Sequence, residues 1–401
     1  MANTLITVAE ARARVLDRVP LLSTESLPVA AALGRVLAAD ILATGDVPRF
    51  PSSAMDGYAV QSGPGGRRLT VVGESRAGTP ARQTLGGGEA IRISTGAAVP
   101  DGATAVIPQE DVEASGGGIR TGAAVEPGQN VRAPGEDMRG GTTILSAGTV
   151  LGGVELGAAA TAGLGTVAVA LRPRVTVLCT GDELRAPGEP LGPGEIHNSN
   201  APMLTGLART GGAQADEAAR LPDDREATRL GIANALERSD VVLISGGVSV
   251  GPHDHVKPVL ADLGAEEVFW SVALQPGKPT WFGTLGDGRL VFGLPGNPVS
   301  AVVTFSLFVW PALARLQGAV TVRGLEPTAV LGVEVRRNPR REQAIRVRLQ
   351  RGDGPPVATP NGAQGSHVLT SLIGADALAM IPAGEGSLPV GTTVALEPLA
   401  G

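Results

Sequence analysis

The sequence predicts a multidomain α/β protein, in which a domain with a parallel-rich sheet is joined to β-rich parts on both sides. The chain has 401 residues, a length typical of about two to three domains. Residues 173–320 alternate apolar strands, Gly-rich loops and helical segments, a pattern typical of a parallel sheet with helices on both faces. Residues from about 52 to 132 and from about 321 to 401 carry short apolar strands separated by turns, which predicts two small β domains.

The elements outside the α/β part follow from local patterns. Residues 7–19 have the apolar spacing of a helix, with Thr7 as its N-cap. Residues 26–43 predict a second helix followed by an extended exit, and prolines 48 and 51 then end the pattern. Residues 136–170 predict a further strand and helix.

Within the α/β part, strands and helices alternate in order along the chain. The predicted strands are 175–180, 241–246 and 289–293, and the predicted helices are 199–210, 225–237, about 254–263, and 298–316. Ligands of such sheets bind at the carboxyl ends of the strands, so the loops that follow the strands are the candidate site.

Composition excludes several classes of partner and site. The net charge of −6 argues against nucleic-acid binding through a general basic surface. No uninterrupted apolar stretch of 18 residues occurs, so we expect no membrane span and a cytoplasmic protein. The single cysteine, Cys179, excludes an intrachain disulfide and a multi-cysteine zinc site, and its place at the end of an apolar run predicts a buried thiol.

Three loops of the α/β part carry groups suited to anion and metal binding: 180–184, 245–251 and 293–301. In the second loop, Gly246 and Gly247 allow backbone N–H groups to approach a phosphate, and Ser245 and Ser249 add hydroxyl groups. Taken singly, such a loop is also a common plain turn before a helix.

Two carboxylates and one lysine complete the candidate site. Glu183 and Asp254 are suited to hold Mg²⁺ together with substrate phosphate oxygens, although each also fits a solvated turn or a helix cap. Lys278 is one of only two lysines and lies in the stiff turn 275–279. Its compact ammonium is not interchangeable with the arginine that the chain uses elsewhere.

Nine short motifs then occur in a fixed order along nearly the whole chain. They are PSSAMDGYA (51–59), RISTGA (92–97), PQE (108–110), Arg132 with GED (135–137), TGDEL (180–184), SGGVSVG (245–251), QPGKP (275–279), GLPGNPVSA (293–301) and QGS (364–366). In this order they resemble the MoeA/gephyrin E-domain family, the molybdopterin molybdotransferases.

The resemblance implies a four-part fold. A discontinuous linker domain would comprise 1–47 and 133–172, with a β-rich domain, 48–132, inserted into it. A molybdopterin-binding α/β domain, 173–320, and a C-terminal β-barrel-like domain, 321–401, would follow.

The resemblance also implies a homodimeric enzyme that inserts molybdate into adenylyl-molybdopterin with Mg²⁺, releasing AMP and molybdenum cofactor. Its site would lie where the α/β domain of one subunit faces the inserted domain of the other. The implied partners are the adenylyltransferase that makes the substrate and the molybdoenzyme delivery factors.

Site residues are carried over from the resemblance position by position. The implied catalytic residues are Asp56, Thr95, Asp137, Glu183 and Asp254, the last two also being the metal ligands. The implied substrate-binding residues are Arg132, Asp223, Ser245, Gly246, Gly247, Ser249, Lys278, Pro295, Pro298 and Ser366. Asp56 and Asp137 also fit turn or cap roles, the two prolines also fit purely conformational roles, and either metal ligand could instead orient the attacking oxygen.

Three positions depart from the family pattern. Ser271 and Gln275 stand where some members carry basic residues, so the anion pocket is expected to be less positive than theirs. Pro252 stands where an acidic residue is common.

Two rival functions belong to different classes. The α/β domain alone also resembles an adenylyltransferase that makes adenylyl-molybdopterin, but the additional domains argue against it. A non-enzymatic scaffold would be favoured by fused domains or long linkers, which the sequence lacks.

Overall fold

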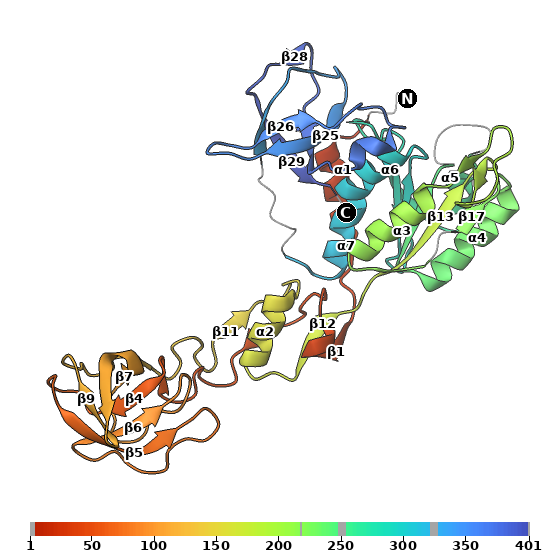
Figure 1. Cartoon of the computed structure of the whole chain (residues 1–401). Helices are drawn as coiled ribbons and strands as arrows, with labels where there is room; N and C mark the ends of the chain where they lie inside the picture. Colours follow the sequence, from red (N-terminus) through yellow and green to blue (C-terminus); the bar gives the residue numbers. More distant parts are fainter. Residues whose placement is uncertain (1–4, 217–218, 248–253, 321–327, 400–401) are drawn as a thin grey trace.

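The computed structural model describes residues 5–216, 219–247, 254–320 and 328–399. The molecule is elongated, as Figure 1 shows: the β-rich insertion lies at one end and the α/β and C-terminal parts lie together at the other. A slender linker region, which carries β1, β2, β11, α2 and β12, connects the two ends.

The first helix is confirmed, together with its cap. Helix α1 (Val8–Leu16) begins after Thr7, whose hydroxyl accepts a hydrogen bond from the backbone N–H of Glu10, while the Glu10 carboxylate accepts one from the backbone N–H of Thr7. The apolar face of α1 packs into the core of the α/β domain.

The helix predicted over 26–43 is wrong. That segment instead contributes to β1 (Thr24–Pro28), a 3-10 turn (Val29–Ala31) and β2 (Ile41–Leu42). Strand β1 pairs antiparallel with β12 (Thr166–Ala170), more than 130 residues away along the chain. The apolar residues that suggested a helical face pack between the pieces of the linker region, so a distant strand overrode the local pattern.

The linker region also contains β11 (Thr143–Leu145) and α2 (Gly153–Thr161), in line with the predicted strand and helix. Strand β11 pairs with β2, which brings the two sequence halves of the region together.

The β-rich insertion forms a six-stranded sheet and a short ribbon. The sheet order is β7-β4-β6-β5-β9-β8. Its strands are β4 (Gly57–Val60), β5 (Arg68–Ser75), β6 (Glu89–Ile93), β7 (Ala105–Pro108), β8 (Val112–Ser115) and β9 (Gly118–Thr121). The ribbon pairs β3 (Ser52–Ser53) with β10 (Val131–Arg132).

The α/β domain contains the parallel-rich sheet that the sequence predicts. Its order is β16-β13-β18-β22-β21-β19, with β17 pairing β13. Pairs among β13, β16, β17, β18 and β22 are parallel, whereas β21 and β19 join antiparallel. The strands are β13 (Arg174–Thr180), β16 (Gln214–Ala215), β17 (Ala219–Leu221), β18 (Val241–Ser245), β19 (Glu266–Trp270), β21 (Trp281–Thr284) and β22 (Leu290–Leu294).

The helices of this domain also match the predicted segments. They are α3 (Asn200–Thr210), α4 (Arg225–Arg238), α5 (Val256–Asp262), and the continuous run of α6 (Pro298–Thr304), a π-helical segment (Phe305–Val309) and α7 (Trp310–Leu316). The 19 residues Pro298–Leu316 are long and apolar enough to cross a membrane, but 78% of the window that meets this test is buried inside the protein. The run is therefore a core helix packed within the α/β domain.

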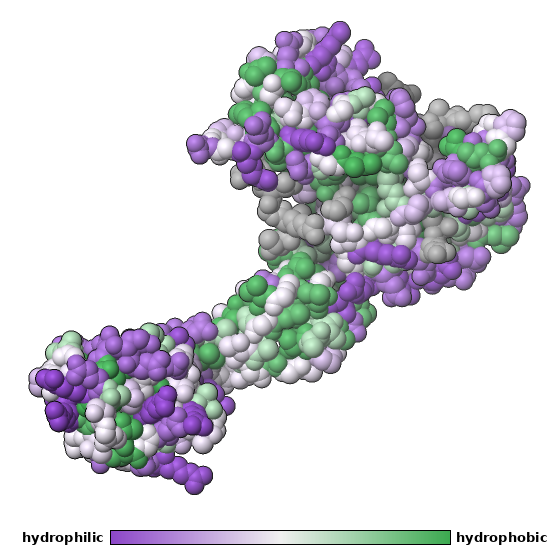
Figure 2. Space-filling model, in the orientation of Figure 1, coloured by the Kyte–Doolittle hydropathy of each residue, from purple (hydrophilic) through white to green (hydrophobic). Residues whose placement is uncertain are grey.

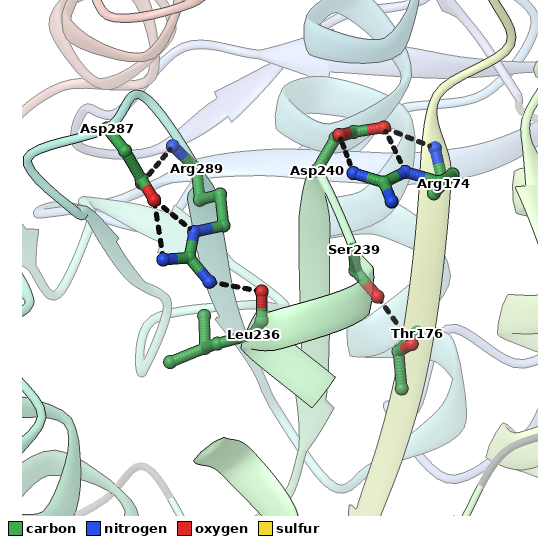
Figure 3. A network of polar contacts seen from close by, with 7 residues as sticks. All are labelled: Arg174, Thr176, Leu236, Ser239, Asp240, Asp287 and Arg289. Carbon is green, nitrogen blue, oxygen red and sulfur yellow. Dashed lines mark hydrogen bonds and ion pairs between the residues drawn. The ribbon is translucent and has the colours of Figure 1, made fainter. Parts of the chain in front are cut away.

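Polar side chains tie together the amino ends of the central strands, at the edge opposite the candidate site (Figure 3). The guanidinium of Arg174 donates to the carboxylate of Asp240 at 2.8 Å, and the backbone N–H of Arg174 donates to the same carboxylate. The hydroxyl groups of Thr176 and Ser239 lie 2.6 Å apart, and Arg289 extends the network to the start of β22. At the other edge the registers pair Cys179 with Ser245 and Ser245 with Leu294, so the ends of these strands lie at a common level.

The C-terminal part is the barrel-like domain that was predicted. Five strands close on themselves in the order β25-β26-β23-β29-β27, with β27 pairing back to β25. They are β23 (Thr328–Leu331), β25 (Glu342–Gln350), β26 (Val357–Pro360), β27 (Ala377–Ile381) and β29 (Thr393–Pro398). Strand β20 (Leu274–Gln275) pairs with β25, and an ion pair of 2.8 Å joins Arg12 to Glu397, so the barrel is docked on the α/β domain.

Candidate active site

A polar pocket of about 400 Å³ lies at the carboxyl edge of the parallel sheet, where the loop argument places the site. It is formed by the ends of β13 and β18 and by the loop after β22. Its lining residues are Cys179, Thr180, Glu183, Leu184, Ile196, His197, Asn198, Ser199, Asn200, Ser245, Gly296, Asn297 and Pro298. Glu183, Ser245 and Pro298, three of the predicted site residues, thus lie together in the wall of one pocket.

The Gly-Gly loop beside this pocket requires both of its glycines. Gly246 and Gly247 have φ values of 92° and 65°, a region that other residues rarely adopt. A Cβ on Gly246 would lie 2.7 Å from the hydroxyl oxygen of Thr180, and one on Gly247 would lie 2.8 Å from Val256. The loop therefore makes a tight turn beside the pocket, and the backbone N–H of Gly246 donates to the carbonyl of Leu294. Ser249 lies outside the described residues.

Asn200 lies in a segment predicted only as a helix, and its side chain holds the pocket together. Its side-chain amide donates to the Ser245 hydroxyl at 2.8 Å and to the Gly296 carbonyl at 2.7 Å. Ser245 in turn donates to the carbonyl of Pro295, so Pro295 acts here through its backbone. The amide oxygen of Asn200 is buried and has no hydrogen-bond partner among the described residues. One sequence signal could have marked Asn200 as a site residue: it is a polar residue in the first turn of a helix that follows a strand and a loop.

The two predicted metal ligands differ in their surroundings. Glu183 is exposed at the pocket, and its carboxylate lies over Gly181, where a Cβ would be 2.4 Å from Oε2. Asp254 is half-buried and lies just before α5. The described part of the chain has no group of three or more His, Cys, Asp and Glu side chains placed around a common point. Mg²⁺ commonly uses one or two carboxylates plus substrate phosphates, and the residues present fit that mode.

A loop of the C-terminal barrel closes one side of the site. The backbone N–H of Val299 donates to the carbonyl of Ser366, and the side chain of Asn297 donates to the Ser366 hydroxyl at 3.2 Å. Behind this loop, the buried guanidinium of Arg346 donates to the carbonyls of Ala363 and Gly365. Burial lowers the pKa of Arg346 to about 10. Arg346 was missed because nothing in a β-strand pattern marks one position as a buried cation.

Asp223 and Lys278, two of the predicted substrate-binding residues, are not among the residues that line the pocket. Asp223 is exposed, and its backbone N–H donates to the carboxylate of Asp182 at 3.3 Å. Lys278 is exposed on the turn between β20 and β21, where its carbonyl accepts from the backbone N–H groups of Val272 and Thr280.

Cys179 is buried, as predicted, although it contributes to the wall of the pocket. Burial raises the pKa of its thiol to about 11, and a hydrogen bond with Asn198 opposes that shift only in part. The side chain is therefore a neutral thiol at neutral pH.

The N-terminal group of predicted site residues forms a second cluster on the β insertion. The Asp56 carboxylate accepts hydrogen bonds from the backbone N–H of Thr95 at 2.7 Å and from its hydroxyl at 3.1 Å. Arg132 and Asp137 line a pocket of about 450 Å³. Ser53 joins the two places, since it exchanges backbone hydrogen bonds with the 96–97 segment beside Thr95 while its strand pairs with Arg132's strand.

The two clusters lie far apart within one chain. Figure 1 shows the β insertion and the carboxyl edge of the α/β sheet separated by the whole linker region. Asp56, Thr95, Arg132 and Asp137 therefore do not meet Glu183 or Asp254 inside a single molecule.

Comparison with known proteins covers nearly the whole chain. Residues 6–163 match the MoeA N-terminal region (domain I and II), residues 176–315 match a probable molybdopterin binding domain, and residues 328–399 match the MoeA C-terminal region (domain IV). A Haemophilus influenzae protein named molybdopterin molybdenumtransferase is 35% identical over 98% of both chains. A Nostoc protein of the same name is 36% identical over 92% of this chain and 88% of the relative.

Solved structures show the same similarity in three dimensions. A molybdopterin biosynthesis MoeA protein from Pyrococcus horikoshii has a TM-score of 0.80 at 34% identity, covering 99% of this chain and 100% of that one. A second MoeA structure from the same species has a TM-score of 0.83 at 30% identity, covering 98% and 100%.

Proposed function

Because the chain belongs to the MoeA family of molybdopterin molybdenumtransferases, we propose that it inserts molybdate into adenylyl-molybdopterin and releases AMP together with molybdenum cofactor. The observation that carries this proposal is the polar pocket at the carboxyl edge of the sheet, with its Gly-Gly loop and the carboxylate of Glu183.

The pocket supplies what a phosphorylated substrate needs. Gly246 and Gly247 form a tight left-handed turn against Thr180 and Val256. The backbone N–H of Gly246 donates to the carbonyl of Leu294, so the N–H of Gly247 is the one proposed to meet a phosphate. Asn200 holds the Ser245 hydroxyl and the Gly296 carbonyl in fixed positions, so the wall of the pocket does not have to reorganise when charge develops. The barrel loop at Ser366 is bonded to Asn297 of the pocket wall and so fixes that side of the site.

Magnesium is part of the proposal. Glu183 would hold it at the pocket together with substrate phosphate oxygens, and Asp254 is the second carboxylate proposed for it. When bound, Mg²⁺ would polarise a phosphoryl oxygen and offset the charge of the departing phosphates. The residue that does not bind the metal would orient the attacking oxygen.

We also propose that the active enzyme is a homodimer whose sites are shared between subunits. Within one chain, the cluster on the β insertion and the pocket of the α/β domain are separated, and each holds only part of the predicted site residues. A second copy of the chain would bring its insertion cluster to the pocket. Figure 2 shows hydrophobic residues gathered over the linker region. Large apolar side chains are exposed there, including Leu33 at 60% and Val154 at 81%. Contiguous apolar surface of this kind is typical of a protein interface.

The substrate chemistry extends the proposal to partners and location. Adenylyl-molybdopterin must come from an adenylyltransferase, and the finished cofactor must pass to a molybdoenzyme delivery factor. A cytoplasmic location is supported by the single cysteine, which offers no disulfide framework of the kind common in exported proteins.

The test is an insertion assay with purified components. Protein, adenylyl-molybdopterin, Mg²⁺ and molybdate should release AMP and yield cofactor that activates an apo-molybdoenzyme, and chelation of Mg²⁺ should stop the reaction. Equal AMP release without any oxyanion would contradict insertion. Incubation with molybdopterin and Mg-ATP without molybdate tests the adenylyltransferase alternative. Inactivity in both assays would favour the non-enzymatic scaffold as the function.

A further inference from the structure

A groove of about 740 Å³ runs beside the polar pocket, on the outer side of α3. Its walls come from one face of α3, from the segment 184–189 and from β17. It is lined by Leu184, Arg185, Ala186, Pro187, Glu189, Asn198, Ala201, Pro202, Thr205, Gly206, Arg209 and Arg220. None of the predicted site residues lies in it.

The groove and the pocket share two walls, Leu184 and Asn198. Helix α3 also connects them, because Asn200 at its start lines the pocket while a stripe from Ala201 to Arg209 lines the groove. The stripe follows helical spacing, so it is one continuous face that leads away from the pocket. A molecule anchored in the pocket can therefore extend along α3 into the groove.

A buried hydroxyl group in the groove has no protein partner. Thr205 is only 5% exposed, and its Oγ has no hydrogen-bond partner among the described residues. A buried hydroxyl without a partner costs free energy of folding, since its hydrogen bonds with water are lost. Within α3 the usual alternative is a bond to a carbonyl one turn back, as Thr210 makes to Gly206. The oxygen itself is closed to solvent, so Thr205 lines the groove through its other atoms and its hydroxyl is not a ligand contact.

The rest of the lining suits a flat heterocycle. A Cβ on the next residue, Gly206, would meet no atom within 4 Å, so the space above it is open. The guanidinium groups of Arg209 and Arg220 are held in place by the backbone carbonyls of Ala215 and Leu184. Guanidinium groups stack on flat rings and donate to carbonyl oxygens and ring nitrogens. Apolar walls with a few fixed polar groups, in this size range, are typical of small-molecule sites.

We propose that this groove is the subsite for a flat, nitrogen-rich heterocycle of the substrate, its pterin or its adenine, while the phosphates lie in the polar pocket. The guanidinium groups of Arg209 and Arg220 contact the ring system, and Gly206 leaves room for its face. The assignment rests on the proposed function, because the substrate named there carries both kinds of ring.

The test fills the groove without disturbing the fold. Gly206→Phe places a ring in the open space, and replacement of a helical glycine does not lower helix stability. Thr210→Phe adds the same ring at an exposed position of α3 that does not line the groove. Binding of AMP and of molybdopterin to the full-length protein is measured separately by calorimetry. Thermal unfolding of both variants is compared with that of the wild type.

We expect Gly206→Phe to raise the Kd of one of the two ligands about tenfold or more, with Thr210→Phe unchanged. Loss of molybdopterin binding alone assigns the pterin to the groove, and loss of AMP binding alone assigns the adenine.

The proposal is overturned if Gly206→Phe, folded as the wild type, binds both ligands with wild-type affinity, or if the wild type binds neither. Failure of the proposed function is a separate result. The proposed function fails if the wild type is inactive in the insertion assay, which contains no groove variant. If the wild type is active and Gly206→Phe is equally active, only the assignment of the groove is contradicted.

Discussion

The side chain of Asn200 joins two loops, at Ser245 and at Gly296, that lie 45 and 96 residues further along the chain. Its amide N–H groups hold the Ser245 hydroxyl and the Gly296 carbonyl, and the carbonyl of Pro295 receives the hydroxyl proton of Ser245. A single buried side chain therefore sets the distance between the end of β18 and the loop after β22.

Replacing this residue should affect stability and activity together. Asn200→Ala leaves the Gly296 carbonyl without its side-chain donor and removes one contact of Ser245, so the free energy of unfolding should fall by about 1–3 kcal/mol. Because the loops lose their fixed spacing, the rate of AMP release should fall as well. Denaturant unfolding and the insertion assay measure the two effects. Unchanged values in both would show that the loops hold their positions without Asn200.

Glu342 provides a pH-dependent prediction. Burial raises the pKa of Glu342, the charge of Glu397 raises it further, and Arg12 opposes the shift. A raised pKa means that the folded state favours the protonated carboxyl, so its stabilising effect is present at acidic pH and is lost as the pH rises through the folded-state pKa. Glu342→Gln cannot ionise and should therefore raise the melting temperature at pH 7, with little difference from wild type near pH 4.

Glu226 serves as the control for that experiment. Its carboxylate is exposed, and the hydrogen bond from Arg229 lowers its pKa. Glu226→Gln should leave the melting temperature at pH 7 unchanged or slightly lower, the opposite direction from Glu342→Gln. Melting curves of both variants across pH 4–8 would refute the assignment if they shifted in the same direction.

Among the elements of the fold, the loop after β18 is the one that backbone geometry restricts most at the pocket. Gly246 combines a left-handed backbone with a close approach to Thr180. By contrast, Gly391 in the C-terminal barrel has a similar φ of 83° but no atom within 4 Å of an added Cβ. Comparing Gly246 with Gly391 therefore separates the effect of backbone strain, which both positions share, from the effect of lost space, which only Gly246 has.

Gly246→Ala should lose activity, whereas Gly391→Ala should not. Each substitution imposes a left-handed conformation on an alanine, a cost of about 1–2 kcal/mol in unfolding free energy. Only the first pushes the loop away from Thr180 and displaces the proposed phosphate contacts. The insertion assay and denaturant unfolding compare the two variants. If Gly246→Ala retained wild-type turnover, the loop would not be a phosphate contact.

On the scale of the whole molecule, the elongated shape separates two clusters of site residues (Figure 1). In a two-fold dimer, each shared site takes one cluster from each subunit, so a defect in either cluster damages both sites of a homodimer. When one subunit carries a defect in the first cluster and its partner carries a defect in the second, both defects fall in the same site and the other site has neither.

Mixing two inactive variants tests this arrangement. Thr95→Trp obstructs the insertion cluster, and Asp254→Asn removes a carboxylate of the α/β site. In a mixed dimer with shared sites, one site carries both lesions and the other carries neither, so about a quarter of all sites should regain activity after subunit exchange. The insertion assay gives the recovery, and mass-tagged subunits verify the exchange. No recovery after verified exchange would place each site within one chain.

Local patterns were sufficient for the fold class and for most elements of the α/β domain. Strands β13, β18 and β22 and helices α3 and α4 follow from apolar periodicity and from the loops between them. The carboxyl-edge position of the pocket follows too, because parallel strands end on one side of a sheet. Such features depend on neighbouring residues, so the sequence by itself determined them.

Contacts between distant residues decided the rest. Strand β1 replaced a predicted helix because it pairs with β12, and a pairing partner far along the chain is not visible in a local window. Asn200 and Arg346 acquired their importance from burial, which depends on what the fold packs around them. The groove along α3 and the separation of the two clusters exist only once the domains are placed, because shape and distance arise from tertiary packing.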